Sequence, residues 1–354
     1  MQEKQELLSL TREELEALLV SLGEPRFRAK QIFTQLHRGL SPEEMTNVGK
    51  VTRERLAEVT SYHLPQVRRK LVSAIDGTVK YLFELSDGQS VESVLMRYEH
   101  GVTICISSQV GCAMGCKFCA STIGGRVRNL TPAELLGQVI AAARDSGERI
   151  GGIVMMGIGE PLDNFDNVVK FLTLVNHPEG VNIGYRHISL STCGLVDKID
   201  ELAKLQLPIT LSISLHAADD ETRAAIMPIN KRWNVAALME ACRRYYQATG
   251  RRISFEYTLI AGKNDAPEAA KRLALLLNRS LRTRTDTMPI HVNLIPVNEV
   301  EETGFRRADK RSISRFAAVL EENGIRATVR RRLGADINAS CGQLRRAEMQ
   351  GENG

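Results

Sequence analysis

From Val102 onward the sequence alternates between short apolar segments and amphipathic segments, and this alternation limits the possible folds. The apolar segments predict strands at 102–107, 151–156, 187–193, 209–215, 252–260 and 291–296. Helical periodicity predicts helices between them, at 132–145, 163–176, 196–206, 235–248 and 266–279. Strands and helices that alternate in this way form parallel sheets with helical crossovers. The pattern predicts an α/β fold, either a partial or a complete barrel, with active groups at the carboxyl ends of its strands.

The first hundred residues follow different patterns. Residues 1–62 read as helical, because Thr11 precedes an apolar periodic run that stops at Gly23, and Ser41 with Pro42 predicts the start of another helix. Residues 70–96 alternate as short strands around two Asp-Gly turns. We therefore predict an N-terminal helical accessory domain at 1–62, a small β-hairpin layer at 63–100, a catalytic domain at 101–346 and a flexible tail at 347–354.

Three cysteines, Cys112, Cys116 and Cys119, form a C-x3-C-x2-C motif after the first predicted barrel strand. Thiolates at this spacing suit a [4Fe–4S] cluster, whose irons favour soft sulfur ligands. Three protein ligands leave one iron open for a substrate, whereas an electron carrier closes the cluster with a fourth cysteine. The alternative is that the three cysteines are buried thiols that pack as small apolar side chains. Three cysteines within eight residues, together with two glycines, are a poor match to a core strand.

With Phe118 directly before its last cysteine, the motif resembles the signature of the radical SAM enzymes. The resemblance implies a partial (β/α)6 barrel and a cluster whose open iron chelates the amine and carboxylate of S-adenosylmethionine. Polar residues at later strand ends are predicted to contact this cofactor, although a tight turn and a structural histidine are the alternatives. These residues are Gly159, Glu160, Ser191, Ser214, Leu215, His216 and Asn298.

Longer motifs resemble the RlmN/Cfr family of RNA adenosine methyltransferases. They include C-I-S-S-Q-V-G-C at 105–112, M-P-I-N-K at 227–231 and D-I-N-A-S-C-G-Q-L at 336–344. The resemblance implies methylation of adenosine 2503 in 23S rRNA and, in some members, of adenosine 37 in tRNA. G-E-P at 159–161 resembles the branch that modifies carbon 2. Members that modify carbon 8 resemble G-E-A and carry an additional cysteine at the position of Val110, so we predict carbon 2.

The resemblance also implies a methyl carrier, because carbon 2 of adenine is electron-poor and cannot attack a sulfonium methyl group. Cys341 accepts a methyl group from one S-adenosylmethionine, and a second molecule provides the 5′-deoxyadenosyl radical that activates it. Cys105 then releases the RNA by forming a disulfide with Cys341. Glu92 matches the proton acceptor of the family, although alone it reads equally as the solvent face of a strand. Cys193 and Cys242 are predicted to be structural.

The charge balance is mild, with 47 basic and 42 acidic residues and a net charge of +5, so RNA binding is predicted from local clusters. The cations of residues 26–30 are as consistent with a solvated helix face as with an RNA contact. The clusters near Cys341 are Arg306-Arg307, Lys310-Arg311, Arg330-Arg331-Arg332 and Arg345-Arg346.

The sequence has no apolar run of membrane-spanning length and no secretory signal, and its seven cysteines do not suggest a disulfide framework. We therefore predict a cytoplasmic monomer that receives electrons from an external donor such as flavodoxin. A radical SAM enzyme acting on a small molecule is the main alternative. A non-catalytic iron–sulfur or RNA-binding module is another, but it would leave Cys105 and Cys341 without a role.

Overall fold

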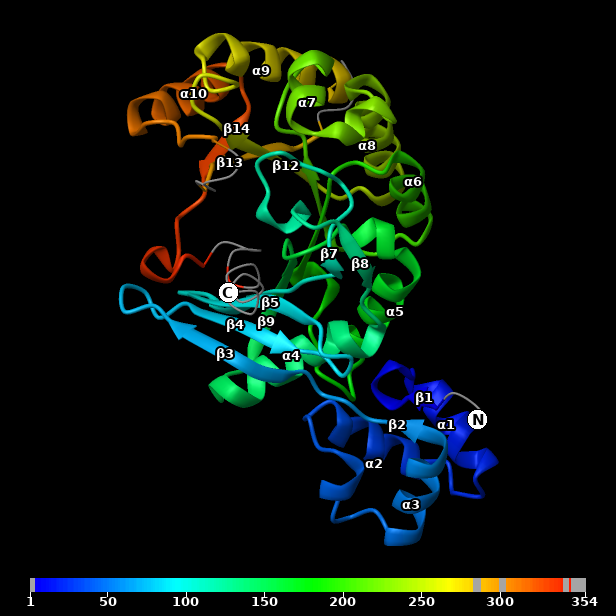
Figure 1. The fold of residues 1–354 in the computed structure, drawn as a ribbon. Coiled ribbons are helices and arrows are strands. Elements are labelled where there is room, and N and C mark those ends of the chain that lie inside the picture. The colour runs from blue at the N-terminus through cyan, green and yellow to red at the C-terminus, as the bar shows by residue number, and fades with distance from the viewer. Residues whose placement is uncertain (1–3, 283–287, 299–303, 340–343, 345–354) are drawn as a thin grey trace.

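The computed structural model describes residues 4–282, 288–298, 304–339 and 344, and its body is a ten-stranded mixed sheet (Figure 1). Its parallel strands are β6 (Gly101–Cys105), β9 (Ile150–Met155), β10 (Ile188–Thr192), β11 (Thr210–Ser214), β12 (Ile253–Leu259), β13 (Ile290–Pro296) and β14 (Arg326–Val329). The accompanying helices are α4 (Pro132–Ser146), α5 (Phe165–Asn176), α6 (Val196–Lys204), α8 (Val235–Thr249), α9 (Pro267–Leu281) and α10 (Lys310–Glu322). The predicted α/β partial barrel is confirmed.

Three antiparallel strands continue the same sheet beyond β6. They are β3 (Gln66–Val72), β4 (Val79–Glu84) and β5 (Ser90–Tyr98), in the order β6-β5-β4-β3. The hairpins predicted for residues 63–100 therefore form, and they extend the barrel sheet. Val94 pairs with Lys80 of β4 and with Cys105 of β6. Because side chains alternate along a strand and paired residues share a face, Lys80, Glu92, Val94 and Cys105 lie on one face of the sheet.

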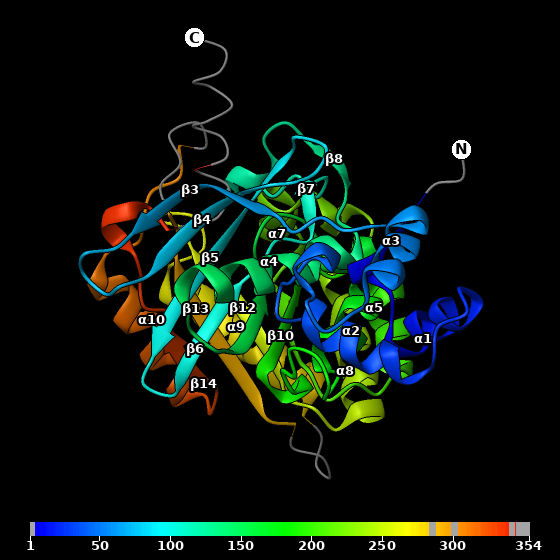
Figure 2. The same cartoon turned by 90° about the horizontal axis from the view of Figure 1, so that it is seen from below.

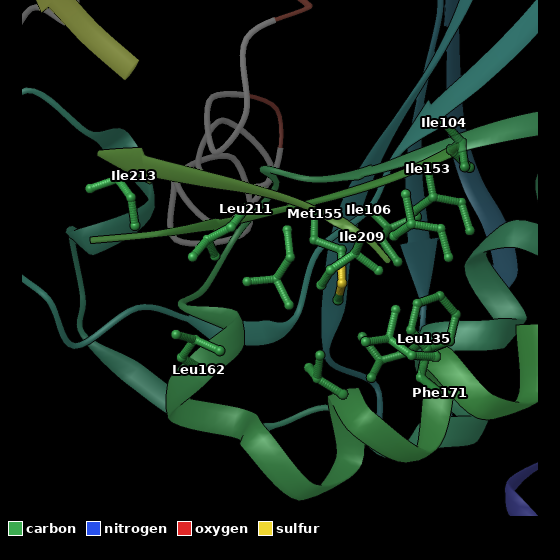
Figure 3. Close-up of a cluster of buried hydrophobic side chains, with 14 of the residues drawn as sticks. Ile104, Ile106, Leu135, Ile153, Met155, Leu162, Phe171, Ile209, Leu211 and Ile213 are labelled. Carbon is green, nitrogen blue, oxygen red and sulfur yellow. The ribbon is translucent and has the colours of Figure 1, made fainter. Parts of the chain in front are cut away.

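The opposite face of the sheet carries the apolar core. Figure 3 shows Ile104 of β6 and Ile153 of β9 on the side of the sheet that faces Leu135 of α4 and Phe171 of α5. All four side chains are fully buried. The neighbouring position on β6, Cys105, points the other way, so the sheet separates an apolar packing face from a face that carries polar groups.

The N-terminal residues form a small helical unit at one end of the molecule (Figures 1 and 2), composed of α1 (Arg12–Ser21), α2 (Phe27–Leu36) and α3 (Lys50–Val59). The predicted helix after Thr11 is confirmed, and Thr11 and Glu14 form a capping box. The helix predicted from Ser41 is wrong, because its capping box opens a single 3-10 turn at Pro42–Glu44. After that turn, Met45 and Val48 are buried in the core, so the helix does not continue.

This helical unit packs on the loop that follows α5. His37 is buried, and its Nδ1 accepts a hydrogen bond from the backbone N–H of Val181. Glu179 forms ion pairs with Arg12, at 3.1 Å, and with Lys30, at 3.2 Å. The accessory unit is therefore attached to the barrel at a defined place. Within residues 26–30, Lys30 takes part in this attachment through its ion pair with Glu179. Across the described ranges, no helix has the length and apolarity needed to span a membrane.

Candidate active site

The cysteine motif occupies a loop between two short antiparallel strands that the sequence pattern did not reveal, β7 (Gln109–Gly111) and β8 (Arg126–Asn129). Gly111 has φ +75°, and a Cβ at this position would overlap the carbonyl oxygen of Gly125. The backbone N–H of Cys112 donates to that same carbonyl at 3.0 Å. Glycine is required here because the two ends of the loop close tightly against each other.

The thiols of Cys112 and Cys116 are desolvated. Burial raises the pKa of Cys112 to about 12 and the pKa of Cys116 well above its usual value, and the nearby thiol of Cys119 adds to both effects. Thiols that raise one another's pKa need a positive charge if they are to bind as thiolates. Iron ions would provide that charge.

The donor set fits a [4Fe–4S] cluster in kind and number, because three cysteines of one loop bind three irons and leave the fourth iron open. Ser121, two residues after Cys119, has a buried hydroxyl without a hydrogen-bond partner in the described part of the chain. Such a hydroxyl can donate to a bound cluster or ligand.

The loop after β9 packs directly against the backbone that enters the cysteine motif. Gly159 has φ +106°, and a Cβ there would overlap Gln109 and Ser108. Glu160 is fully buried; its Oε2 accepts from the N–H of Cys193 at 2.7 Å and its Oε1 from the N–H of Leu162 at 3.1 Å. Burial raises the pKa of Glu160. This carboxyl ties the ends of β9 and β10 together beside the cysteine loop.

Arg223 is a buried cation at the same strand ends, and the sequence analysis missed it. Only 1% of its surface is exposed. Its guanidinium donates to the carbonyls of Leu215, Ser214 and Cys193 and to Oδ1 of Asn230, at 2.7–3.2 Å. It lies on α7 (Asp220–Ile226), a helix that the sequence analysis did not predict. The M-P-I-N-K motif directly after this helix was the sequence signal that could have pointed to Arg223.

The charge of Arg223 belongs to the electrostatics of the cysteine site. Burial lowers the pKa of Arg223, whereas Cys193 and Cys116 act in the opposite direction. A buried guanidinium that donates mainly to neutral carbonyls is stabilised by negative charge nearby. Thiolates bound to a cluster would supply such charge.

His216 is a positioned neutral imidazole. Its Nδ1 accepts from the backbone N–H of Thr258 at 2.9 Å, and its ring meets Phe118 edge-on at 4.9 Å. Burial, with Arg223 as a second cause, lowers the pKa of His216 to about 3. Nδ1 is an acceptor, so the proton of the neutral ring lies on Nε2. The described contacts connect the end of β11 with the aromatic residue of the cysteine motif.

Glu92 and Cys105 lie on the inner face of the sheet. The reading of Glu92 as the solvent face of a strand is wrong, because the side chain is 0% exposed and pairs with Lys80, which is 1% exposed, at 3.1 Å. Cys105 is buried in a small apolar cluster with Val94 and Met96, and Leu333 and Ala339 of the C-terminal segment pack against that cluster. The structure thus brings two of the three predicted catalytic residues onto one face.

A cavity of about 250 Å³ opens between this face and the cysteine loop. Of the predicted site residues, Cys105, Cys119 and Asn298 line it, and four arginines from two distant segments complete the wall, Arg307 and Arg330 to Arg332. The remaining predicted cofactor contacts lie at the neighbouring strand ends. Lys310 and Arg311 lie at the start of α10, away from the lining. Cys341, Arg345-Arg346 and the tail at 347–354 lie outside the described residues.

Comparisons with known proteins agree with this site. Residues 5–61 match the family described as ribosomal RNA large subunit methyltransferase N-terminal domain, and residues 106–274, which include the cysteine motif, match the radical SAM superfamily. A crystal structure of a radical SAM methyltransferase from Sphaerobacter thermophilus has a TM-score of 0.89 at 43% identity, covering 96% of this chain and 98% of that one.

Similar proteins extend over the whole length. A protein of Alkaliphilus oremlandii named probable dual-specificity RNA methyltransferase RlmN is 51% identical, covering 98% of this chain and 99% of the relative. A protein of the same name from Clostridium perfringens is 50% identical, covering 96% of each chain. Radical SAM enzymes work with a [4Fe–4S] cluster and S-adenosylmethionine, and the donor set described above fits both. The chain therefore belongs to the RlmN family of radical SAM RNA methyltransferases.

Proposed function

We propose that this enzyme methylates carbon 2 of adenosine 2503 in 23S rRNA, using a methyl group carried by Cys341. The observation that carries the proposal is the cavity at the inner face. Its walls come from the cysteine loop, from Cys105 and from Ala339, which lies two residues before Cys341. The proposed cluster site, Cys105 and the segment that leads to Cys341 thus surround the same cavity.

Cys112, Cys116 and Cys119 would hold the cluster, and Asn298, which lines the cavity, is the best placed of the proposed contacts to S-adenosylmethionine. When bound, the cluster supplies the electron that cleaves S-adenosylmethionine and so makes a radical able to activate a methyl group. Two molecules of S-adenosylmethionine are used in each turnover, one as methyl donor and one as radical source. Phe118 and Cys119, both half-buried, line the cavity beside this proposed cluster site.

The two cysteines outside the cluster divide the remaining work. The thiolate of Cys341 accepts the methyl group, as suits a soft nucleophile. After the methyl carbon has joined the adenine, a thioether links the RNA to Cys341. The thiolate of Cys105 attacks the sulfur of Cys341 and forms the Cys105–Cys341 disulfide. The bond between that sulfur and the linking methylene carbon breaks, the electron pair of the bond stays on the carbon, and the carbon takes up a proton to become the methyl group of the released base. Glu92, on the same face as Cys105, accepts the proton that leaves carbon 2.

RNA reaches the cavity past Arg307 and residues 330–332, whose exposed guanidinium groups suit phosphate contacts. The target base must leave its stack to enter a space of this size. Because full-length relatives are named dual-specificity enzymes, we propose adenosine 37 of tRNA as a second substrate. The enzyme would act as a cytoplasmic monomer with an external electron donor such as flavodoxin.

The deciding experiment compares Cys105→Ala with Cys341→Ala after one anaerobic turnover on an rRNA fragment. Cys105→Ala can still couple methyl-Cys341 to adenine but cannot resolve the thioether, so a nuclease-sensitive slow band should appear on a denaturing gel. Cys341→Ala has no carrier and should give no such band. The wild-type product is compared with 2-methyladenosine and 8-methyladenosine standards, and 5′-deoxyadenosine formed without RNA-dependent methylation would favour a small-molecule substrate. A band with Cys341→Ala, or none with Cys105→Ala, would refute the assigned roles.

A further inference from the structure

The C-terminal segment 334–339 lies against the turn that connects β3 with β4, far from it in sequence. Figures 1 and 2 show the two side by side, the segment in red beside the tip of the blue-to-cyan hairpin. Asp336 Oδ1 accepts from the hydroxyl of Ser73 at 2.7 Å, and its Oδ2 accepts from the backbone N–H of Ala74 at 2.9 Å. In return, Asp76 Oδ2 accepts from the backbone N–H of Gly334 at 2.9 Å. The turn and the C-terminal segment therefore each provide a carboxylate that accepts hydrogen bonds from the other.

Both carboxylates are held in their charged form. The hydroxyl of Ser73 is the main cause that lowers the pKa of Asp336. Burial alone would raise the pKa of Asp76, but the backbone N–H groups of Gly334 and Thr78 hold it at about 2. Hydrogen bonds to ionised groups are stronger than neutral ones. Both carboxylates are therefore ionised at neutral pH.

The segment itself is a compact turn that depends on glycine. Gly334 has φ +59°, and a Cβ on it would lie 2.6 Å from the Cβ of Ala339. The N–H of Ala339 donates back to the carbonyl of Gly334 at 3.1 Å. Closure of this turn places Ala339 against the small apolar cluster formed by Val94, Met96 and Cys105.

Lys80 connects this turn with the proposed proton acceptor. Its Nζ donates to the carbonyl of Asn338 at 3.0 Å and pairs with Oε2 of Glu92 at 3.1 Å. The ammonium group is almost fully buried, so its position is set by these partners and by the walls around it. One side chain thus contacts both the segment that leads to Cys341 and the residue assigned to the carbon 2 proton.

We propose that the β3–β4 turn is a clasp for segment 334–339, and that Lys80 is a positioning residue that aligns this segment and Glu92 with Cys105. The inference rests on the proposed function for the role of Cys341, whereas the clasp itself rests on the contacts above. Its purpose is to bring Cys341 back to the same place after each methyl transfer, so that Cys105 can reach its sulfur.

The test uses the full-length, ligand-free protein and a mild oxidant, oxidised glutathione, which takes two electrons from the two thiols and is itself reduced to two glutathione thiols. The rate of Cys105–Cys341 disulfide formation is followed by non-reducing peptide mass mapping. Asp336→Ala removes the two contacts that Asp336 makes with Ser73 and Ala74, and the disulfide should form several-fold more slowly than in the wild type. Hydrogen exchange at the amide of Ala74 should become faster in the same variant.

A matched control exists in the next hairpin. Asp87 caps its turn through the N–H of Gln89 at 3.1 Å, as Asp76 does through Thr78 at 3.0 Å, but the side-chain partner of Asp87 is Arg128 of β8 and not the segment 334–339. Asp87→Ala should leave the disulfide rate unchanged. Ser73→Ala should slow it as well, because this change removes the hydroxyl that donates to Asp336 and that also accepts from the N–H groups of Ile75 and Asp76 within the turn.

Activity provides a second readout. Asp336→Ala should lower kcat for RNA methylation several-fold without changing KM for RNA, because residues 330–332 are untouched. Lys80→Arg should retain more activity than Lys80→Met, which removes both contacts. Equal disulfide rates in wild type and Asp336→Ala, or absence of the disulfide in the wild type, would overturn the clasp. Normal clasp behaviour in a protein that methylates no RNA would instead overturn the proposed function.

Discussion

Replacing Arg223 by methionine tests whether this buried guanidinium holds the strand ends around the cysteine loop. The side chain donates four hydrogen bonds, to three backbone carbonyls and to Asn230. Methionine has a similar length and removes the donors without opening a large cavity. The change therefore isolates the hydrogen bonds and the charge.

The expected loss follows from the number of acceptors left without a donor. At about 1 kcal/mol for each group the cost is about 4 kcal/mol. Release of a buried charge offsets part of it, so we expect unfolding free energy to fall by about 3 kcal/mol. Arg243→Met is the control, because Arg243 is exposed and pairs with Glu240 on the same helix, and such pairs contribute less than about 1 kcal/mol.

Urea unfolding of the metal-free protein measures the loss. The fluorescence of Trp233 is suited to it, because the chain has one tryptophan and it follows the M-P-I-N-K motif that Arg223 contacts through Asn230. Arg223→Met should also bind less iron per chain after reconstitution, and Arg223→Lys should lie between methionine and wild type. A loss no larger than that of Arg243→Met, with normal iron binding, would refute the reasoning.

Three further outcomes are expected. Burial lowers the pKa of His37 to about 3 from 6.5, so between these values the unfolded chain binds a proton that the folded chain lacks, and stability falls by about 1.4 kcal/mol per pH unit as pH decreases. His37→Asn should reduce this slope in urea unfolding at pH 7 and pH 5, and an unchanged slope would contradict the prediction. RNA affinity should decrease with salt by about 0.7 to 0.9 logarithmic units per phosphate contact. Charge reversal at residues 330–332 should flatten this dependence, whereas an unaltered slope would place the RNA surface elsewhere, for instance at residues 26–30. Anaerobic purification should give colourless protein for each of the three cluster-ligand variants, Cys112→Ala, Cys116→Ala and Cys119→Ala. Loss of the cluster from Cys193→Ala or Cys242→Ala would show that the ligand assignment is wrong.

The alternation of strands and helices and the cysteine motif could be read from the sequence because both are local. A parallel strand buried on both faces is a continuous apolar run, and its crossover helix follows within the same unit. The predicted strand at 291–296 differs from β13 (Ile290–Pro296) by one residue. The three cluster cysteines lie within eight residues, so a single loop positions them. Resemblance to a known family added Cys105, Cys341 and Glu92, which local pattern does not distinguish.

The tertiary structure decided which polar residues are buried and what they contact. Glu92 occupies a strand whose alternation is compatible with either face toward water, and it is buried because Lys80 and the C-terminal segment cover that face. Arg223 sits in a short helix without a strong periodic signal, and its role depends on carbonyls from two strands. The clasp joins residues more than 250 positions apart. Local sequence determines the elements, but contacts of this range depend on how the sheet closes, and no short window contains both partners.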